Sequence, residues 1–221
     1  MDKKVPNPLT PIREKKFRRV IKSRQPNITV ILENVHDSHN VGAVMRSCDS
    51  IGIGEVFVLS TDTKKEKLAV GKRTSAGSKK WIDVHFYTDR EACFKHVRSK
   101  YATIVATHLG KSAKSIYEID LAGSIALLFG NEHAGVSEES LKHADANMII
   151  PQVGMTSSLN ISVACAVTLY EAYRQRMEKG YYTDNPLLSE QEQTELYDIF
   201  LERSRKKGFN NKHSAKWQFK E

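Results

Sequence analysis

The sequence predicts an α/β protein with a mostly parallel sheet flanked by helices. Short runs rich in β-branched and apolar residues recur between residues 28 and 150, and most have no polar face. Strands of a parallel sheet that is covered on both faces show this pattern. Helical patterns separate several of the runs, which indicates parallel strands joined by crossover helices. The 221 residues, 40% of them apolar, suit one domain with extensions.

The first expected element is a basic amphipathic helix. Thr10 and Pro11 form a good N-cap and first-turn pair. Phe17, Val20 and Ile21 recur at helical spacing, and Pro26 should end the helix. The basic side chains between them are Arg13, Lys15, Lys16, Arg18, Arg19, Lys22 and Arg24. Such a face is either an ordinary solvated surface or a phosphate-binding surface, and its one-sided charge favours phosphate.

The alternating elements follow from residue 28 onward. We expect strands at 28–32, 55–59, 82–86, 103–106, 125–129 and 147–150. We expect helices at 41–51, 89–99 and 137–144. Ser137, with two glutamates behind it, is a plausible start for the last of these helices.

Two further helices are expected towards the C-terminus. The stretch after residue 159 has almost no polar face, so it should be buried by its own domain or by another subunit. Ser189 and Glu192 form a capping-box pair that opens a helix through about Arg205. Gly208 should end that helix, and the tail beyond it is basic. The basic residues of this C-terminal segment are Arg203, Arg205, Lys206 and Lys207.

Charge and cysteine usage bound the function. The formal net charge is +8 and the pI is about 9.3, an excess that favours anionic partners, with nucleic acid first among them. Cys48, Cys93 and Cys165 are scattered, which favours free thiols in a reducing compartment. We find neither a signal peptide nor a membrane anchor, so we expect a cytoplasmic protein and no membrane partner. We expect no metal, because no HExxH motif or Cys/His cluster occurs.

A ligand pocket is expected at one edge of the sheet. Open α/β sheets bind ligands outside the carboxyl ends of their strands. The segments that follow the strands at 28–32, 103–106, 125–129 and 147–150 are all rich in Gly, Asn or small hydroxyl residues. These residues allow a ligand to approach the backbone closely, although each segment alone fits a simple turn. Dinucleotide, phosphate-loop and nucleophile-elbow motifs are missing from the sequence.

The stretch IALLFGNEHAG shows the pattern most sharply. A buried strand runs directly into Gly130, Asn131 and Glu132, which places an amide and a carboxylate at its end. We expect the strand to stop at Gly130 because a ligand approaches the backbone there. The alternative is an Asn-Glu turn that caps a helix.

Arg46 has two possible interpretations. In the helix at 41–51 it points away from the apolar stripe, so it is either a solvent-facing arginine or a group that grips a phosphate or a ribose-adjacent oxygen. It follows Asn40 by six residues, beside a strand exit, which favours the functional interpretation.

Three blocks resemble a known family. They are ENVHDSHNVGAVMRSCDSIGI (33–53), LFGNEHAGVS (128–137) and IPQVGMTSSLNISVACAV (150–167). In this order and spacing they resemble the three motifs of the SpoU branch of the SPOUT RNA ribose 2′-O-methyltransferases. RTSAGSKKW (73–81) resembles a stretch between the first two motifs, and the likeness covers roughly residues 10–180.

The resemblance implies a fold, a cofactor and a set of site residues. The fold would be a SPOUT fold with a C-terminal trefoil knot, divided into a basic helical extension (1–26), the methyltransferase domain (27–177) and a C-terminal helical extension (178–221). The protein would bind S-adenosyl-L-methionine in the knot and work as a homodimer. The implied catalytic residues are Arg46, Asn40, Glu132 and Asn160. The implied cofactor-binding residues are Thr107, Leu109, Gly130, Ile150, Ser158 and Leu159. The expected RNA-binding residues are Arg13, Lys16, Arg19 and Arg205.

Within the family the likeness implies a tRNA ribose 2′-O-methyltransferase that acts on guanosine 18. One alternative is another target, either a different tRNA nucleotide or ribosomal RNA. A second is a non-catalytic RNA-binding protein that retains the fold. A nucleotide-binding oxidoreductase would lack its glycine fingerprint.

Overall fold

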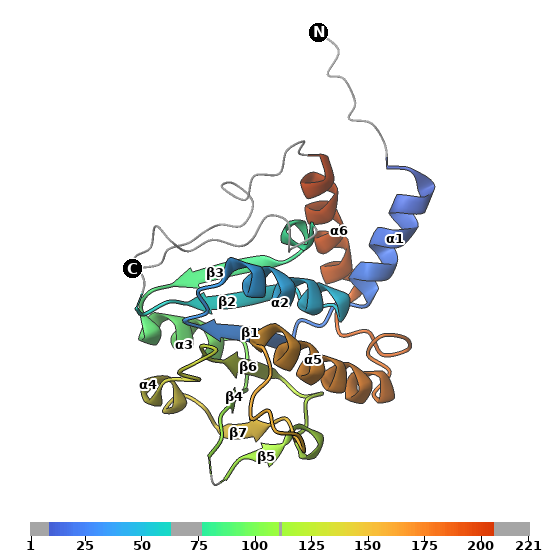
Figure 1. Cartoon of the computed structure of the whole chain (residues 1–221). Coiled ribbons are helices and arrows are strands. Elements are labelled where there is room, and N and C mark those ends of the chain that lie inside the picture. Colours follow the sequence, from blue (N-terminus) through green and yellow to red (C-terminus); the bar gives the residue numbers. More distant parts are fainter. Residues whose placement is uncertain (1–8, 63–76, 111, 206–221) are drawn as a thin grey trace.

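A seven-stranded parallel sheet forms the centre of the protein, in the strand order β3-β2-β1-β6-β4-β7-β5 (Figure 1). The structure is a computed structural model that describes residues 9–62, 77–110 and 112–205. The strands are β1 (Ile28–Glu33), β2 (Glu55–Leu59), β3 (Asp83–Tyr87), β4 (Thr103–Thr107), β5 (Lys114–Ser115), β6 (Ile125–Phe129) and β7 (Ala146–Ile149). All of the strand pairs are parallel, so the carboxyl ends of β1, β4, β6 and β7 meet at one edge.

Helices cover both faces of this sheet. They are α1 (Pro11–Lys22), α2 (Ser38–Ser50), α3 (Arg90–Arg98), α4 (Glu138–Leu141), α5 (Ile161–Glu178) and α6 (Glu190–Arg205), with 3-10 turns η2 (Ser78–Lys80) and η3 (Ile116–Glu118). Helices α2 and α5 pack on one face through Val44, Met45, Cys48, Cys165 and Leu169. Helix α3 packs on the other face through Cys93, Phe94 and Val97, and α4 adds Leu141. The α/β class expected from the alternating pattern is confirmed.

The two terminal helices, α1 and α6, lie side by side beyond the β3 side of the sheet (Figure 1). Phe17, Ile21 and Phe200 form a small separate core, and Trp81 packs against it. Arg24 is buried beneath this core and donates hydrogen bonds to the carbonyl oxygens of Ile53 and Trp81, both at 2.7 Å. The extensions are therefore anchored to the sheet by apolar packing and by a buried arginine.

Most element positions match the sequence pattern, and the differences have local causes. Helix α2 begins at Ser38 instead of 41, because the side chain of Asp37 caps it by accepting from the backbone N–H of His39 at 2.8 Å. That hydrogen bond lowers the pKa of Asp37. The helix expected at 137–144 is a single turn, Glu138–Leu141. Strand β5 was not expected, because two residues carry no periodicity.

The helix after residue 159 buries one face and exposes apolar residues on another. Cys165, Leu169 and Ala172 are fully buried, whereas Val163, Val167 and Tyr170 are 47%, 36% and 55% exposed. The exposed residues recur at helical spacing and form one apolar stripe on α5. Of the two alternatives that the sequence left open, its own domain covers one face of the helix. The C-terminal trefoil knot stays a prediction.

Candidate functional site

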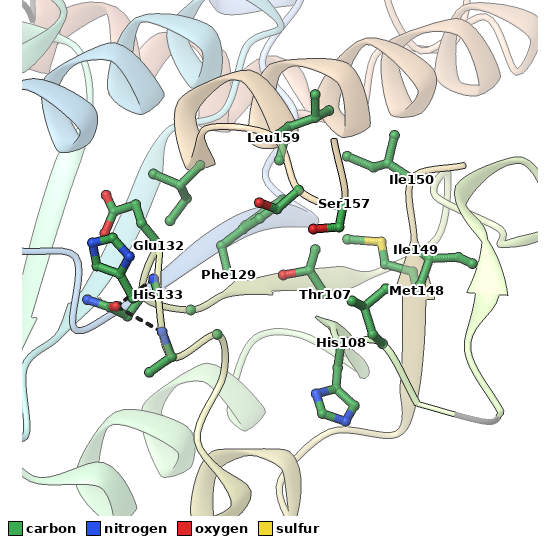
Figure 2. A pocket seen from close by; sticks show the side chains of 18 of the residues that line it. Thr107, His108, Phe129, Glu132, His133, Met148, Ile149, Ile150, Ser157 and Leu159 are labelled. Atoms are coloured by element: carbon green, nitrogen blue, oxygen red, sulfur yellow. Dashed lines mark hydrogen bonds between the residues drawn. The ribbon is translucent and has the colours of Figure 1, made fainter. Parts of the chain in front are cut away.

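A cavity of about 490 Å³ opens at the carboxyl ends of β4, β6 and β7 (Figure 2). Every residue expected to hold a cofactor lines it: Thr107, Leu109, Gly130, Ile150, Ser158 and Leu159. These residues come from segments as far apart as 107 and 159, which parallel pairing brings to one edge. Figure 2 shows Thr107 at the centre, Leu159 above it and Ile150 to one side, with Glu132 and His133 across the cavity. Three of the four strand exits that were expected to form a pocket, those after β4, β6 and β7, therefore line one cavity, whereas the exit of β1 contributes no lining residue.

The loop after β6 has a conformation that explains Gly130. Asn131 and Gly135 exchange backbone hydrogen bonds, both at 2.9 Å, and close the loop on itself. A Cβ atom on Gly130 would lie 2.0 Å from the carbonyl carbon of Gly135 and 2.2 Å from the nitrogen of Val136. The expectation that a ligand requires this glycine was incomplete, because the returning loop already excludes a side chain. Gly130 still lines the cavity with its backbone.

A hydrogen-bonded relay joins the three sequence blocks. The side-chain amide of Asn40 donates to Glu132 Oε1 at 2.7 Å, and the amide of Asn160 donates to Asn40 Oδ1 at 3.3 Å. Asn40 lies in the first turn of α2, Glu132 in the loop after β6 and Asn160 at the N-cap of α5. The structure thus brings together three of the four residues named as catalytic.

Asn160 is held in place by its own helix. Its Oδ1 accepts from the backbone N–H of Ser162 at 2.9 Å and from the Ser162 hydroxyl at 2.6 Å. Because both lone-pair directions of Oδ1 are used, the NH₂ group is turned towards Asn40. The side chain of Asn40 is therefore held at both ends, by Asn160 at the start of α5 and by Glu132.

The remaining catalytic candidate, Arg46, lies outside this relay and does not line the cavity. It follows Asn40 by six residues in α2, about 9 Å along the helix axis. Its side chain is exposed, and among the described residues it has no hydrogen bond or ion pair. The solvent-facing orientation expected from the helical pattern is confirmed, and a ligand would have to reach Arg46 across the surface of α2.

Glu33 supports the site from behind, and sequence reasoning missed it. This fully buried carboxylate ends β1 and accepts from the backbone N–H of Ser137 at 2.9 Å and from its hydroxyl at 2.7 Å. Ser140 donates a further hydrogen bond, and the guanidinium of Arg90 lies 3.6 Å away. These contacts fix the end of the loop that carries Glu132. The available signal was an acidic residue that closes an otherwise apolar strand, because a buried carboxylate requires partners.

Asn34 ties neighbouring strand exits together. It has a φ of 52°, a left-handed conformation that is uncommon for a residue with a side chain. Its Oδ1 accepts from the backbone N–H of Thr61 at 2.8 Å, and its carbonyl oxygen accepts from the Asn131 side chain at 2.9 Å. The exits of β1, β2 and β6 are therefore linked beside the cavity.

Further cavity residues were seen in the sequence but given no binding role. The cavity is also lined by His108, Asn131, His133, Gln152 and Ser157. In the described ranges no group of three or more His, Cys, Asp or Glu residues could hold a metal ion.

The four predicted RNA-binding side chains are exposed on two helices, whereas other basic residues nearby are used within the fold. Arg13, Lys16 and Arg19 are exposed on α1, and Arg205 is exposed at the end of α6. Other basic residues of the same segments are occupied within the fold. Arg24 is buried, and Arg203 donates to Asp83 Oδ1 at 2.6 Å and is only 14% exposed. Lys206, Lys207 and the tail beyond Gly208 lie outside the described residues.

The chemistry of the cavity suits S-adenosylmethionine. Its walls combine apolar side chains, including Phe129, Met148 and Leu159, with the backbone and small hydroxyl groups of the strand exits. Ligand pockets have this mixture and a comparable volume. The carboxylate of Glu132 at the cavity wall complements a positively charged sulfonium group.

Comparison with known proteins agrees with this geometry. The chain is 40% identical over 192 residues to the tRNA (guanosine(18)-2′-O)-methyltransferase of Thermus thermophilus, covering 87% of this chain and 95% of that protein. The fold matches the crystal structure of the A. aeolicus TrmH/SpoU tRNA modifying enzyme with a TM-score of 0.79 and 34% identity, over 89% of this chain and 98% of the other.

A second solved structure is that of the SpoU methyltransferase AviRb from Streptomyces viridochromogenes in complex with AdoMet. It matches with a TM-score of 0.61 and 26% identity, over 70% of this chain and 62% of that one.

Residues 27–170 match the family described as the SpoU rRNA Methylase family. This range contains the cavity, the Asn40–Glu132–Asn160 relay and Arg46. The chain therefore belongs to the SpoU methylase family.

Proposed function

We propose that the protein is an S-adenosylmethionine-dependent tRNA ribose 2′-O-methyltransferase that acts on guanosine 18. The observation that carries the proposal is the hydrogen-bonded meeting of Asn40, Glu132 and Asn160, in which Glu132 lines the same cavity as all six expected cofactor residues. Relatives that are 35–40% identical over most of their length are tRNA (guanosine(18)-2′-O)-methyltransferases.

When bound, S-adenosylmethionine supplies a methyl group on a sulfonium centre. The residues that hold it are Thr107, Leu109, Gly130, Ile150, Ser158 and Leu159, largely through backbone groups at the strand exits. The protein's task is then to place a ribose hydroxyl in line with that methyl group. The relay of Asn40, Glu132 and Asn160 orients the cavity mouth and presents preorganised polar groups to the sugar.

Arg46 engages the RNA. Arginine holds its proton tightly, so it serves poorly as a free base. Its planar guanidinium instead binds the 2′-hydroxyl or the adjacent phosphate and favours loss of the hydroxyl proton. Its exposed position, with no partner among the residues that the structure describes, on the helix that also carries Asn40, supports this role.

The tRNA body lies against α1 and the end of α6. Arg13, Lys16, Arg19 and Arg205 are exposed there and contact phosphates, which gives affinity without sequence choice. In this arrangement residues 27–177 form the catalytic domain, and residues 1–26 and 178–221 contribute to RNA binding. The cytoplasm, where tRNA is processed, is the expected location. Among the described helices none is long and apolar enough to cross a membrane.

The protein acts as a homodimer through the exposed stripe of α5. Val163, Val167, Tyr170 and Met177 form this stripe, and Val153 and Met155 of the preceding segment are fully exposed. An apolar patch of this kind on a protein surface marks an association site. A Val163→Glu, Val167→Glu double variant should sediment as a monomer, whereas an unchanged dimer would place the interface elsewhere.

The deciding experiment measures methyl transfer directly. Purified protein, labelled S-adenosylmethionine and an unmodified tRNA transcript are incubated together, and ribose methylation is mapped along the product. We expect modification at guanosine 18 and none in a transcript with 2′-deoxyguanosine at that position. Methylation elsewhere in tRNA, or only in ribosomal RNA, would replace the proposed substrate. Binding of RNA without binding of S-adenosylmethionine would favour a non-catalytic protein.

A further inference from the structure

A second cavity of about 380 Å³ lies between α1, α2 and α6, and it shares no lining residue with the cofactor cavity. Its aromatic side is built by Phe17, Trp81 and Phe200. The Trp81 ring centre lies 5.3 Å from that of Phe17 and 4.8 Å from that of Phe200. Trp81 is only partly buried, so part of the indole is available to a ligand.

The rim of this cavity is basic. Arg13 and Lys16, from successive turns of α1, line it, and both side chains are exposed. The guanidinium of Arg13 lies 5.6 Å from the Phe17 ring centre, at the boundary between the aromatic side and solvent. A phosphate attached to a planar group inside the cavity would meet these two cations.

The carboxylate of Asp49 also lines this cavity. It comes from α2, and its side chain is 31% exposed. Within the described part of the chain its only polar partner is Arg24, whose Nη2 lies 3.7 Å from Oδ1, too far for a hydrogen bond. Burial raises the pKa of Asp49, although Arg24 and Lys16 act in the opposite direction. A donor supplied by a ligand would therefore satisfy an acceptor that the fold leaves without a hydrogen bond.

We propose that this cavity binds a nucleobase of the RNA substrate, with guanine preferred. Aromatic side chains stack on any base, and the basic rim receives its phosphate. Guanine presents two adjacent N–H donors on its Watson–Crick edge, which suit a carboxylate such as that of Asp49. A peptide fits less well, because an acidic peptide would satisfy Arg13 and Lys16 but offer no planar donor edge to Asp49.

The position of the cavity connects it to the catalytic site. Asp49 follows Arg46 by three residues on α2, so the two side chains are neighbours on the helix surface. Asn40 lies about 13 Å from Asp49 along the same axis and, at 100° per residue, on the opposite side of the helix. An RNA strand that crosses the exposed side of α2, which carries Arg46, would place one ribose at the cofactor cavity and the base of a nearby nucleotide in the second cavity. The inference rests on the proposed RNA substrate.

Trp81 makes a direct test practical. The chain has two tryptophans, so a Trp217→Phe variant leaves Trp81 as the only one. The intact variant is titrated with GMP, with inosine 5′-monophosphate, which lacks the exocyclic amine, and with ribose 5-phosphate. We expect GMP to quench the Trp81 fluorescence and to bind about tenfold more tightly than inosine 5′-monophosphate. Ribose 5-phosphate should leave the fluorescence unchanged, because it has no base to stack.

Two substitutions test the assigned roles. Asp49→Asn should lower GMP affinity about tenfold, to that of inosine 5′-monophosphate, while Arg13→Ala should weaken both nucleotides equally. The controls are Asp198→Asn and Lys95→Ala, which change exposed charges on α6 and α3 and should leave both affinities unaltered. With tRNA, Asp49→Asn should raise the KM about tenfold without changing the kcat.

Several results would overturn the inference. In the titrations they are the absence of quenching by any nucleotide, equal affinity for GMP and inosine 5′-monophosphate, and displacement of GMP by S-adenosylhomocysteine. Binding of a peptide in place of nucleotides, or an unchanged KM for tRNA in Asp49→Asn, would also contradict it. Binding of S-adenosylmethionine is measured on the same samples by calorimetry. If it fails while GMP still quenches Trp81, the proposed methyltransferase function is wrong and the nucleobase site is retained.

Discussion

Two carboxylates at opposite ends of the sheet have contrasting surroundings. Glu55 begins β2, and its side chain is 16% exposed. It accepts hydrogen bonds from His85 at 2.8 Å, Lys100 at 2.6 Å and Tyr101 at 2.8 Å. Glu132, at the carboxyl-end cavity, is exposed and, within the described part of the chain, accepts one hydrogen bond, from Asn40.

The difference separates a structural polar cluster from a functional one. Burial alone would raise the pKa of Glu55, but the hydrogen bonds from His85, Lys100 and Tyr101 outweigh it and lower the pKa to about 2. The charge of Glu55 is thus satisfied within the fold and contributes to stability. The relay around Glu132 leaves hydrogen-bonding groups directed at a cavity. These groups are useful only when a ligand occupies that cavity. Variants at the two ends should therefore affect different properties.

The largest expected effect is at Arg46. Arg46→Ala should lower the kcat for tRNA methylation about 10³-fold, because it removes a cation that acts on the reacting nucleotide. Its affinity for S-adenosylmethionine and its melting temperature should remain unchanged, since the side chain has no partner among the described residues. Single-turnover kinetics and calorimetry measure these quantities. Arg46→Lys is the control that keeps the charge but loses the planar fork, and equal loss of cofactor binding and turnover in Arg46→Ala would contradict the assignment.

A somewhat smaller effect is expected in the relay. Asn160→Ala should lower the kcat about 10²-fold, because Asn40 loses the amide that orients it. The variant also loses the N-cap of α5, at a cost of about 1 kcal/mol in unfolding free energy. Asn160→Asp keeps the capping oxygen but not the donor to Asn40, so it should restore stability without activity. Recovery of both would show that only the cap matters.

At Glu55 we expect the opposite result, a loss of stability without a loss of activity. Glu55→Gln should lower the free energy of unfolding by about 2 kcal/mol, because the charge-assisted hydrogen bonds from Lys100 and His85 are lost. The kcat of the folded fraction should stay the same. Urea denaturation and an activity assay separate the two, with Glu195→Gln on the surface of α6 as the control. A loss of activity without a loss of stability would remove the distinction between the two ends.

The stability conferred by Glu55 should also depend on pH. Its folded-state pKa of about 2 lies below the ordinary value of 4.5, so the stabilisation is complete above pH 4.5 and disappears as the pH falls towards 2. The difference of about 2 kcal/mol between the wild type and Glu55→Gln should therefore close over this range. Denaturation series at several pH values measure it. A constant difference would mean that Glu55 stabilises the fold without its charge.

Local sequence patterns are enough to predict most of the elements and the segments that carry the chemistry. The strands at 28–33, 55–59, 103–107 and 125–129 lie where apolar runs indicated, because a doubly covered strand must be apolar on both faces. Glu132 was singled out at the end of its strand, whereas Asn40 and Asn160 were named through the resemblance to the SpoU motifs. Arg46 was expected to point to solvent from the 100° helical spacing, and it does.

Tertiary structure alone decided which of these residues meet. Asn40 and Glu132 are 92 residues apart, and Asn160 and Asn40 are 120 apart, so no local pattern could pair them. The same holds for Arg24 and Arg203, which counted as free basic residues in the sequence but bind backbone carbonyls and Asp83 in the fold. Side-chain periodicity is a local property, whereas the hydrogen-bond partners named above and the Asp49 cavity depend on how distant segments pack.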